Sequence, residues 1–260
     1  MSVILFVIDG LRPDGLMQAD APCIKSLISQ GMSTLKAVTV MPSVTLPCHV
    51  SLFMGVTPER HGVTTNIWTP PARPLPGLID LLQQAGRKTA MFSNWEELRD
   101  LSRPGALNAS FFLKNCYDPD GTGDPELAQV ASDWLAGHLY DFIFVYLGYV
   151  DVAGHDFGWM SDRYLEAITS ADRCVQQILA SIPGDKIVLV TSDHGGHAQT
   201  HGTDSPEDMT IPIILQGPAI PNGLTLDQTV QITDLAPTIL EIFNIPSPRE
   251  WIGRSLLKMV

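Results

Sequence analysis

The sequence predicts an α/β fold in three layers, with a mostly parallel central sheet covered by helices on both faces. Short apolar, β-prone runs alternate along the chain with longer segments of helical character. The apolar runs are nearly continuous, which is typical of strands buried on both faces of a parallel sheet. The 260 residues, 45% of them hydrophobic, suit one domain over residues 1–260 with a single sizeable core.

The predicted strands are runs of apolar or β-branched residues bounded by turn-forming residues. They are Val3–Ile8, Thr34–Val40, Lys88–Phe92, Phe142–Leu147, Lys186–Val190 and Pro212–Leu215, with Thr229–Ile232 as a further candidate. The predicted helices are marked by proline near their starts, glycine after their ends, or a capping residue such as Asp124. They are Ala21–Gln30, Thr45–Met54, Leu78–Ala85, Pro125–Leu139, Ser161–Ser181 and Leu235–Phe243.

Two segments show neither the period of a helix nor that of a strand. Thr65–Gly77 is rich in proline and is predicted to be a surface loop. Arg99–Gly123 is also irregular, and residues 95–123 are a candidate for a small lid.

Composition narrows the partners that the protein is expected to have. A net charge of −12 disfavours non-specific nucleic-acid binding, which needs a basic surface. No run of about 18 apolar residues is present, so no membrane span is predicted. No secretory leader is visible and the four cysteines form no CxxC pair, which favours a cytoplasmic protein with reduced thiols, although a leader removed beforehand would leave the same sequence. The oligomeric state is not indicated.

Acidic and imidazole side chains follow several of the predicted strands. The candidates are Asp9, Asp151, His155, Asp193, His194 and His201. Such a donor set suits a borderline divalent metal such as zinc. Six ligands exceed one tetrahedral ion, but two sets of three leave each ion an open position. Two divalent ions (about +4) against three carboxylates (about −3) would make the site locally positive and suited to an anionic substrate.

Each of these residues also has an ordinary explanation. An aspartate at a strand end is often a helix cap or a turn residue. The D-x-x-x-H spacing of Asp151 and His155 is common by chance, and Ser192–Gly195 has the composition of a turn. The joint pattern favours the metal site, because every one of these motifs follows a predicted strand.

Thr45 is the candidate nucleophile. It stands at or near the start of a predicted helix, where backbone N–H groups and the helix dipole favour an anion. A neighbouring metal ion would lower the pKa of its hydroxyl. Taken alone, the local sequence is better explained by Thr45 as a simple N-cap, and Ser43 offers a competing hydroxyl.

The order of these residues resembles the alkaline phosphatase superfamily, and within it the type I phosphodiesterase/nucleotide pyrophosphatase branch. Thr45–His49 resembles the T-F-P-N-H nucleophile motif, and Gly55–Gly62 resembles its G-x-x-P-x-x-H-G continuation. His201–Asp204 resembles the late H-G-x-D motif. Asn66 falls where the family places an asparagine that binds a phosphoryl oxygen. The resemblance spans nearly the whole chain.

The resemblance implies two divalent ions, zinc or alternatively manganese, and a covalent phospho-threonine intermediate on Thr45. One implied ligand set is Asp151, His155 and His201, and the other is Asp9, Asp193, His194 and the Thr45 oxygen. Asn66 and the Thr45 backbone N–H would hold a non-bridging oxygen. Tyr149, two residues before Asp151, is a further candidate for a substrate contact.

Two departures from the family pattern bear on specificity. Only six residues separate His194 from His201, so the long insertion of the extracellular members is effectively absent. We therefore expect a more open pocket, and the resemblance does not imply nucleotide specificity. His197 is a rival for the last ligand, but Gly202 and Asp204 complete the motif around His201.

The expected function is hydrolysis of a phosphodiester or pyrophosphate bond in a small phosphorylated substrate. A phosphomonoesterase or phosphonate hydrolase is the alternative, and a non-catalytic phosphate- or metal-binding module is a third. No obvious Lys or Arg lies inside the motifs, which favours diesters, although Arg12 and Arg60 lie close. A sulfatase is not expected, because Cys48 lacks the C-x-P-x-R setting. A phosphoglycerate mutase is not expected either, because those enzymes use a serine nucleophile and have a much longer chain.

Overall fold

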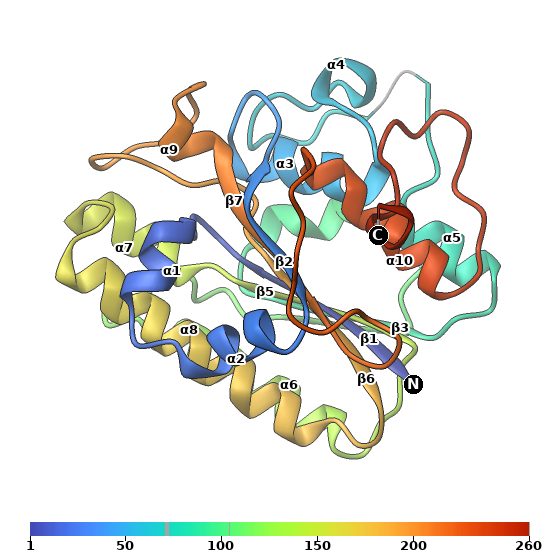
Figure 1. The fold of residues 1–260 in the computed structure, drawn as a ribbon, viewed down its shortest axis with the longest axis horizontal. Coiled ribbons are helices and arrows are strands. Elements are labelled where there is room, and N and C mark those ends of the chain that lie inside the picture. Colours follow the sequence, from blue (N-terminus) through green and yellow to red (C-terminus); the bar gives the residue numbers. More distant parts are fainter. Residues whose placement is uncertain (71–72, 104, 260) are drawn as a thin grey trace.

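The computed structural model describes residues 1–70, 73–103 and 105–259 (Figure 1). Pro71 and Ala72 of the predicted loop and Pro104 of the predicted lid lie outside the described residues. Eight strands form one sheet in the order β4-β3-β5-β1-β6-β7-β2-β8. Their bounds are β1 Ser2–Ile8, β2 Met32–Val38, β3 Thr89–Ser93, β4 Ala109–Phe112, β5 Phe142–Leu147, β6 Lys186–Thr191, β7 Thr210–Gln216 and β8 Leu224–Thr225.

The helices lie on both faces of the sheet. They are α1 Pro13–Gln18, α2 Pro22–Ser29, α3 Thr45–Met54, α4 Pro58–His61, α5 Leu78–Gln84, α6 Gly123–Leu135, α7 Tyr149–Phe157, α8 Asp162–Ser181, α9 Pro206–Met209 and α10 Leu235–Ile242. Short 3₁₀ turns are η1 Glu96–Leu101, η2 Ile232–Asp234 and η3 Leu256–Lys258. Helices α3, α5 and α10 pack on one face, and α1, α2, α6, α7 and α8 on the other (Figure 1).

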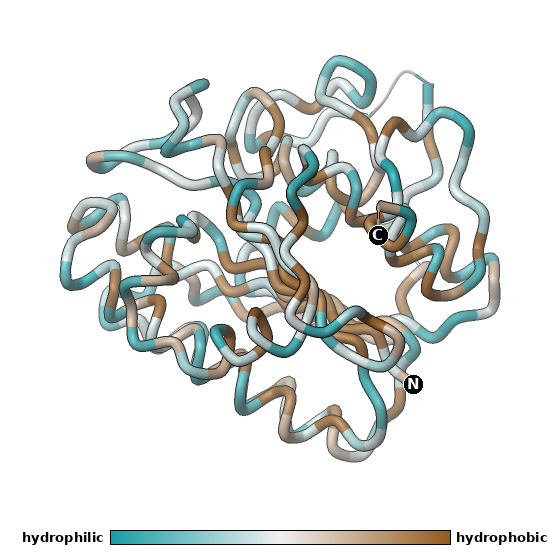
Figure 2. The backbone as a smooth tube through the Cα atoms, viewed as in Figure 1, coloured by the Kyte–Doolittle hydropathy of each residue, from teal (hydrophilic) through white to brown (hydrophobic). Residues whose placement is uncertain are grey.

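Strand β1 lies at the centre of the sheet and explains the continuous apolar runs of the sequence. It pairs in parallel with β5 on one side and β6 on the other. Val3, Leu5 and Val7 belong to one core, whereas the alternate residues of β1 belong to the core on the opposite face. Figure 2 shows the same concentration of apolar residues along the central strands. Strand β7 is antiparallel to both β6 and β2, whereas the other described pairings of the sheet are parallel. The predicted mostly parallel, three-layer fold is therefore confirmed.

Several predicted elements differ from the structure. Thr229–Ile232 is not a strand: only an isolated bridge joins Gln231 to Val38 before the turn η2 begins. The strand predicted at Thr34–Val40 starts at Met32 and contains a register shift after Thr34. Asp124 does not cap helix α6, whose N-cap is Thr122.

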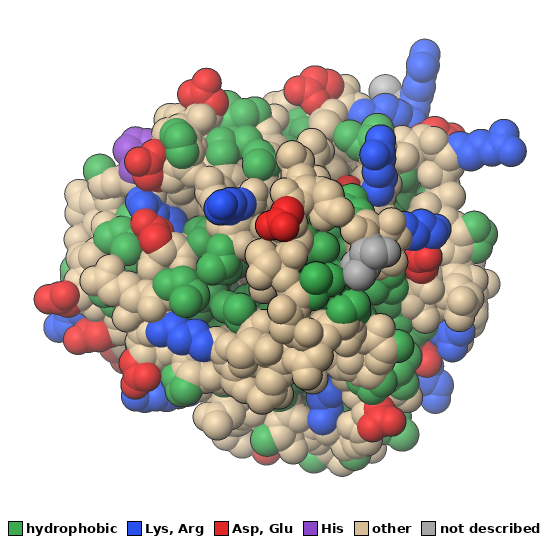
Figure 3. All heavy atoms as spheres, in the orientation of Figure 1, with side chains coloured by type: hydrophobic (Ala, Val, Ile, Leu, Met, Phe, Trp, Pro, Cys, Tyr) green, Lys and Arg blue, Asp and Glu red, His purple; other side chains and the backbone are tan. Residues whose placement is uncertain are grey.

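The candidate lid segment contributes to the sheet. It contains the edge strand β4, which pairs in parallel with β3. After β4 the chain runs through a loop in which Cys116 and Tyr117 line a cavity that also contains Asp9. In the view of Figure 3, the described Lys and Arg side chains are interspersed with Asp and Glu.

Candidate active site

The register of three adjacent parallel strands brings the predicted ligands together. Asp9 follows β1 directly, and Asp193 and His194 follow β6 after Ser192. In the sheet, the last residue of β1 lies opposite the last residue of β5, which leads into α7. The carboxyl ends of all three strands therefore meet at one edge, where such folds place their ligands.

The first predicted ligand set converges on Asp151. This aspartate and His155 are four residues apart on α7 and so face the same side of the helix. The Nε2 atom of His155 lies 3.5 Å from Asp151 Oδ2, and that of His201 lies 3.7 Å from Asp151 Oδ1. Ligand atoms from these three residues lie within 4.8 Å of one another, a spacing that one cation can bridge.

The second set converges on the Nε2 atom of His194. It lies 3.3 Å from both Asp9 Oδ1 and Asp193 Oδ2, and 3.2 Å from Thr45 Oγ1. Ligand atoms of Asp9, Asp151 and His194 also lie within 4.8 Å of one another. The two sets are therefore adjacent, with Asp151 beside both.

The three histidines present their Nε2 atoms to the site because their Nδ1 atoms are engaged by backbone carbonyls. His155 pairs with Gln199 O at 2.9 Å, His194 with Gly195 O at 2.8 Å and His201 with Ser43 O at 2.8 Å. A carbonyl oxygen only accepts, so each Nδ1 carries the proton and each Nε2 keeps a free lone pair. This outer hydrogen bond fixes the tautomer that a metal ligand requires.

The carboxylates carry buried oxygens that lack a partner. Among the described residues, Asp9 Oδ1, Asp151 Oδ1 and Asp193 Oδ2 accept no hydrogen bond. Burial raises the pKa of Asp9 and Asp151 well above 3.8 and that of Asp193 to about 7. Burying unpaired charge is costly in a protein interior, and a bound cation removes that cost. The donor set therefore fits divalent metal.

Thr45 is the first residue of α3, and Val44 occupies the N-cap position. The Thr45 hydroxyl is therefore not a cap, and it lies beside His194 instead. The competing hydroxyl of Ser43 donates to the carbonyl of Thr203 at 2.7 Å. Of the two hydroxyls, Thr45 is the one that lies within the ligand cluster.

Of the two predicted substrate contacts, Asn66 lines the cavity and Tyr149 does not. The Asn66 Oδ1 accepts a hydrogen bond from the Leu46 N–H at 3.0 Å. Tyr149 does not appear among the lining residues of the described cavity: its hydroxyl donates to Pro119 O at 3.4 Å and its ring packs on Gly121.

The cavity lined by Asp9, Thr45, Asp151, His155 and His201 has a volume of about 120 Å³. Its walls include four side chains that sequence reasoning did not assign to the site: Trp95, Cys116, Tyr117 and Tyr146. Tyr146 donates its phenol hydrogen to Asp9 Oδ2, which leaves only Oδ1 of that carboxylate free. Its place near the end of β5 was the available signal, but the apolar strand around it gave no sign of a polar contact.

The other histidines of the motifs serve local structure. His197 Nδ1 pairs with the buried Asp208 at 2.7 Å, so the structure places the rival of His201 outside the cluster. His49 Nδ1 donates to Thr45 O at 2.8 Å, and His61 Nε2 bonds the Ser51 hydroxyl at 2.9 Å.

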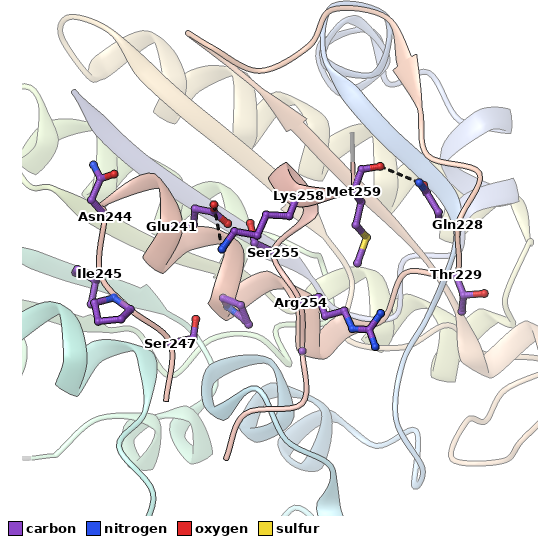
Figure 4. Close-up of a pocket in the computed structure, with 13 residues that line it drawn as sticks. Gln228, Thr229, Glu241, Asn244, Ile245, Ser247, Arg254, Ser255, Lys258 and Met259 are labelled. Carbon is purple, nitrogen blue, oxygen red and sulfur yellow. Dashed lines mark hydrogen bonds and ion pairs between the residues drawn. The ribbon is translucent and has the colours of Figure 1, made fainter. Parts of the chain in front are cut away.

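A larger cavity, of about 890 Å³, lies between α10 and the C-terminal segment (Figure 4). Its described lining residues include none of the predicted ligands. Lys258 there pairs with Glu241 at 3.3 Å, and Gln228 donates to the carbonyl of Met259. The larger cavity and the ligand cluster are therefore separate.

The fold is alkaline phosphatase-like, and it gathers carboxylates, imidazoles and one hydroxyl at one edge of its sheet. A family model described as type I phosphodiesterase / nucleotide pyrophosphatase matches residues 3–210. The chain belongs to this family of phosphodiesterases and nucleotide pyrophosphatases. Among the described residues, no helix has the length and apolar character needed to cross a membrane.

Solved structures share the fold at low sequence identity. Human ectonucleotide pyrophosphatase / phosphodiesterase 5 superposes with a TM-score of 0.81 at 14% identity, covering 100% of this chain and 98% of its own. The inactive threonine-to-alanine variant of the murine protein, in complex with AMP, gives 0.79 at 15% identity, with 95% and 96% covered. A phosphonate monoester hydrolase from Silicibacter pomeroyi gives 0.74 at 16% identity, with 98% and 76% covered. These likenesses establish the fold.

Curated relatives by sequence are 2,3-bisphosphoglycerate-independent phosphoglycerate mutases. That of Microcystis aeruginosa (strain NIES-843 / IAM M-2473) is 34% identical over 135 residues, which cover 46% of this chain and 24% of the mutase. That of Staphylococcus aureus (strain Mu50 / ATCC 700699) is 32% identical over 125 residues, covering 45% and 23%. The chain thus matches about a quarter of the length of these relatives.

Proposed function

We propose that the protein is a two-metal hydrolase that cleaves a phosphodiester or pyrophosphate bond of a small phosphorylated substrate through a phospho-threonine at Thr45. One observation carries this proposal. The Thr45 hydroxyl lies 3.2 Å from His194 Nε2, at the meeting point of the two ligand sets and at the N-terminus of α3. A nucleophile in this position would lie beside the bound cations, at a helix end that favours an anion.

The residues would hold the two cations in adjoining sets. One set is Asp151, His155 and His201, and the other is Asp9, Asp193, His194 and the Thr45 oxygen. Zinc suits this mixture of imidazole and carboxylate donors, and manganese is the alternative. When bound, the cations would lower the pKa of the Thr45 hydroxyl and neutralise charge on the phosphoryl oxygens and the departing oxygen.

The proposed reaction has two displacements at phosphorus. Thr45 Oγ1 forms a bond to phosphorus as the bond to the leaving oxygen breaks, and that oxygen takes a proton. Water then attacks the phospho-threonine, and the bond from phosphorus to Thr45 breaks to restore the hydroxyl. Asn66 is fixed by its bond to Leu46 N–H, so its amide group is free to donate to a non-bridging oxygen during both steps.

The charges around the cavity favour diesters over monoesters. A monoester carries more negative charge and needs more cationic partners, whereas no described residue lining this cavity is Lys or Arg. Arg12 pairs with Asp14 at 2.6 Å, and Arg60 donates to the carbonyl of Arg73. Neither arginine lines the cavity. The phosphonate monoester hydrolase among the structural neighbours keeps monoester or phosphonate hydrolysis as the second candidate.

The test compares bis(4-nitrophenyl) phosphate with 4-nitrophenyl phosphate, with Zn²⁺ or Mn²⁺ present. We expect faster diester hydrolysis, and a Thr45→Ala variant that loses at least about a thousandfold in kcat. Ser43→Ala is the matched control and should keep its rate, because the Ser43 contact with His201 uses the backbone carbonyl. Mass spectrometry of quenched wild-type reactions should show phosphate on Thr45. If Thr45→Ala turns over substrate at the wild-type rate, Thr45 is not the nucleophile. If the wild type hydrolyses the monoester faster than the diester, the proposed substrate preference is wrong.

A further inference from the structure

A buried carboxylate on α6 receives the first N–H groups of α7. Asp124 Oδ1 accepts from the Gly148 N–H at 3.0 Å, and Oδ2 accepts from the Tyr149 N–H at 3.2 Å. Gly148 is the N-cap of α7 and has no side chain that could do this. A side chain 24 residues earlier therefore caps the helix, where a carboxylate also meets the positive end of the helix dipole.

The orientation of this carboxylate is itself fixed. The Asn94 amide donates to Asp124 Oδ1 at 2.7 Å, and both side chains are buried. Gly148 has little room to move, because a Cβ added there would lie 3.1 Å from the Cys116 Cβ and 3.2 Å from Asn94 Oδ1. The start of α7 is thus held by hydrogen bonds and by close packing together.

Helix α7 carries two of the predicted ligands. Asp151 is its third residue and His155 its seventh, both within two turns of the capped end. A shift of the N-terminus of α7 moves these two side chains together. Asp9, Asp193 and His194 instead follow strands β1 and β6, which the sheet holds independently of α7.

We propose that Asp124 is a positioning residue: by capping α7 it places Asp151 and His155, and so controls the affinity of one of the two metal positions without touching it. This inference rests on the two-metal site proposed above. If Asp124 is a positioning residue, its loss should weaken the two metal positions unequally. A general effect on folding would weaken both alike.

The chain contains a matched control at another helix. Asp172 on α8 accepts from the Ile24 N–H at 2.7 Å and from the Cys23 N–H at 3.2 Å, at the start of α2. It is 1% exposed, against 2% for Asp124. Helix α2 carries no predicted ligand, so replacing Asp172 removes the same kind of cap without moving the site.

The experiment measures Zn²⁺ binding by equilibrium dialysis for the wild type, Asp124→Asn and Asp172→Asn, with circular dichroism to confirm folding. The wild type should bind two ions. Asp124→Asn keeps one acceptor oxygen of the two, and should lose about tenfold to a hundredfold in affinity at the position that both Asp151 and His155 would hold, and much less at the other. Asp172→Asn should keep both affinities. With Co²⁺ in place of Zn²⁺, the absorption spectrum of one of the two bound ions should change in Asp124→Asn. In Asp172→Asn the spectra of both ions should match those of the wild type.

Each contrary result has a distinct meaning. Fewer than two ions in the wild type would overturn the two-metal proposal and this inference with it. Two ions in the wild type and unchanged affinities in Asp124→Asn would overturn the positioning role alone, as would equal losses in Asp124→Asn and Asp172→Asn. If Asp124→Asn does not fold, Asn94→Ala serves instead: it leaves both backbone hydrogen bonds and should weaken the same position by a smaller factor. Unchanged binding in Asn94→Ala would then overturn the role.

Discussion

The indole Nε1 of Trp159 donates a hydrogen bond to the carbonyl oxygen of Gly10 at 3.0 Å. The same ring packs on two other glycines: a Cβ added at Gly154 would lie 2.6 Å from it, and one added at Gly196 would lie 2.2 Å from it. One side chain therefore contacts the residue after Asp9, helix α7 and the loop after β6. These are the segments that carry the predicted metal ligands.

Trp159→Phe should weaken this junction while keeping most of its packing. The Gly10 carbonyl also accepts from the Tyr164 hydroxyl at 2.8 Å, so it stays paired and the free energy of unfolding should fall by only about 1 kcal/mol. Zn²⁺ affinity should fall by roughly tenfold, because the ring packs against the segments that position the predicted ligands. Trp134→Phe is the control, since it loses an indole bond to Tyr140 at a distance from the site. Equal Zn²⁺ affinity in both variants would contradict this role.

Gly10→Ala should disturb the site more than a comparable change elsewhere. Gly10 has a φ of +67°, and a Cβ there would lie 3.0 Å from the Asp151 Cα. Gly86 has a φ of +70° with nothing within 4 Å, so Gly86→Ala should cost only the backbone strain, about 1–2 kcal/mol in urea unfolding. Gly10→Ala should cost more and should lower Zn²⁺ affinity. Similar losses in both variants would show that the approach of Asp151 to Gly10 does not matter.

The central strands could be predicted because both of their faces are buried, so every residue of β1 and β5 is buried and nearly all are apolar. The edge strands could not. β8 has two residues and β4 has four with alternating partial exposure, which is too little pattern to separate from a loop. The prediction that strand ends carry the site residues depended on the central strands alone, and the structure places those residues together.

Helix α7 was missed although it carries Asp151 and His155. It has only nine residues, and Gly154 and the β-branched Val150 and Val152 weaken its helical propensity. The four-residue spacing of the two ligands was in fact the spacing of a helix face. Tyr146 and Trp159 were missed for another reason: their partners Asp9 and Gly10 lie 137 and 149 residues away, so no local pattern records them.

Asp208 should contribute stability that disappears in acid. Burial raises its pKa, but the hydrogen bonds from His197 and Thr203 outweigh burial and bring the pKa below 3.8. The folded state thus favours the ionised form, so this stability is present above about pH 4 and is lost as the pH falls through the lowered pKa. Asp208→Asn should lower the free energy of unfolding by about 1.5–3 kcal/mol at pH 7 and by less at pH 3. Urea titrations at both pH values measure this, and an equal loss at each would refute it.

Asn66 combines two roles that its substitutions can separate. Its Oδ1 caps the Leu46 N–H at the start of α3, where Val44 provides no side-chain cap, and its amide is proposed to donate to the phosphoryl group. Asn66→Asp keeps an acceptor for Leu46 but removes the donor, whereas Asn66→Ala removes both. Only the alanine variant should lose the capping contribution, about 0.5–2 kcal/mol in urea unfolding.

The value of kcat should depend on the amide donor of Asn66 and not on its capping of α3. If the amide stabilises the transition state, both variants should lose about a hundredfold to a thousandfold in kcat on bis(4-nitrophenyl) phosphate. The aspartate variant should be the slower of the two, because it also places a negative charge beside an anionic substrate. If Asn66 acts only by capping α3, the order is reversed: Asn66→Asp stays near the wild-type rate and Asn66→Ala falls. Measured kcat and unfolding free energy for the two variants therefore distinguish a substrate contact from a structural one.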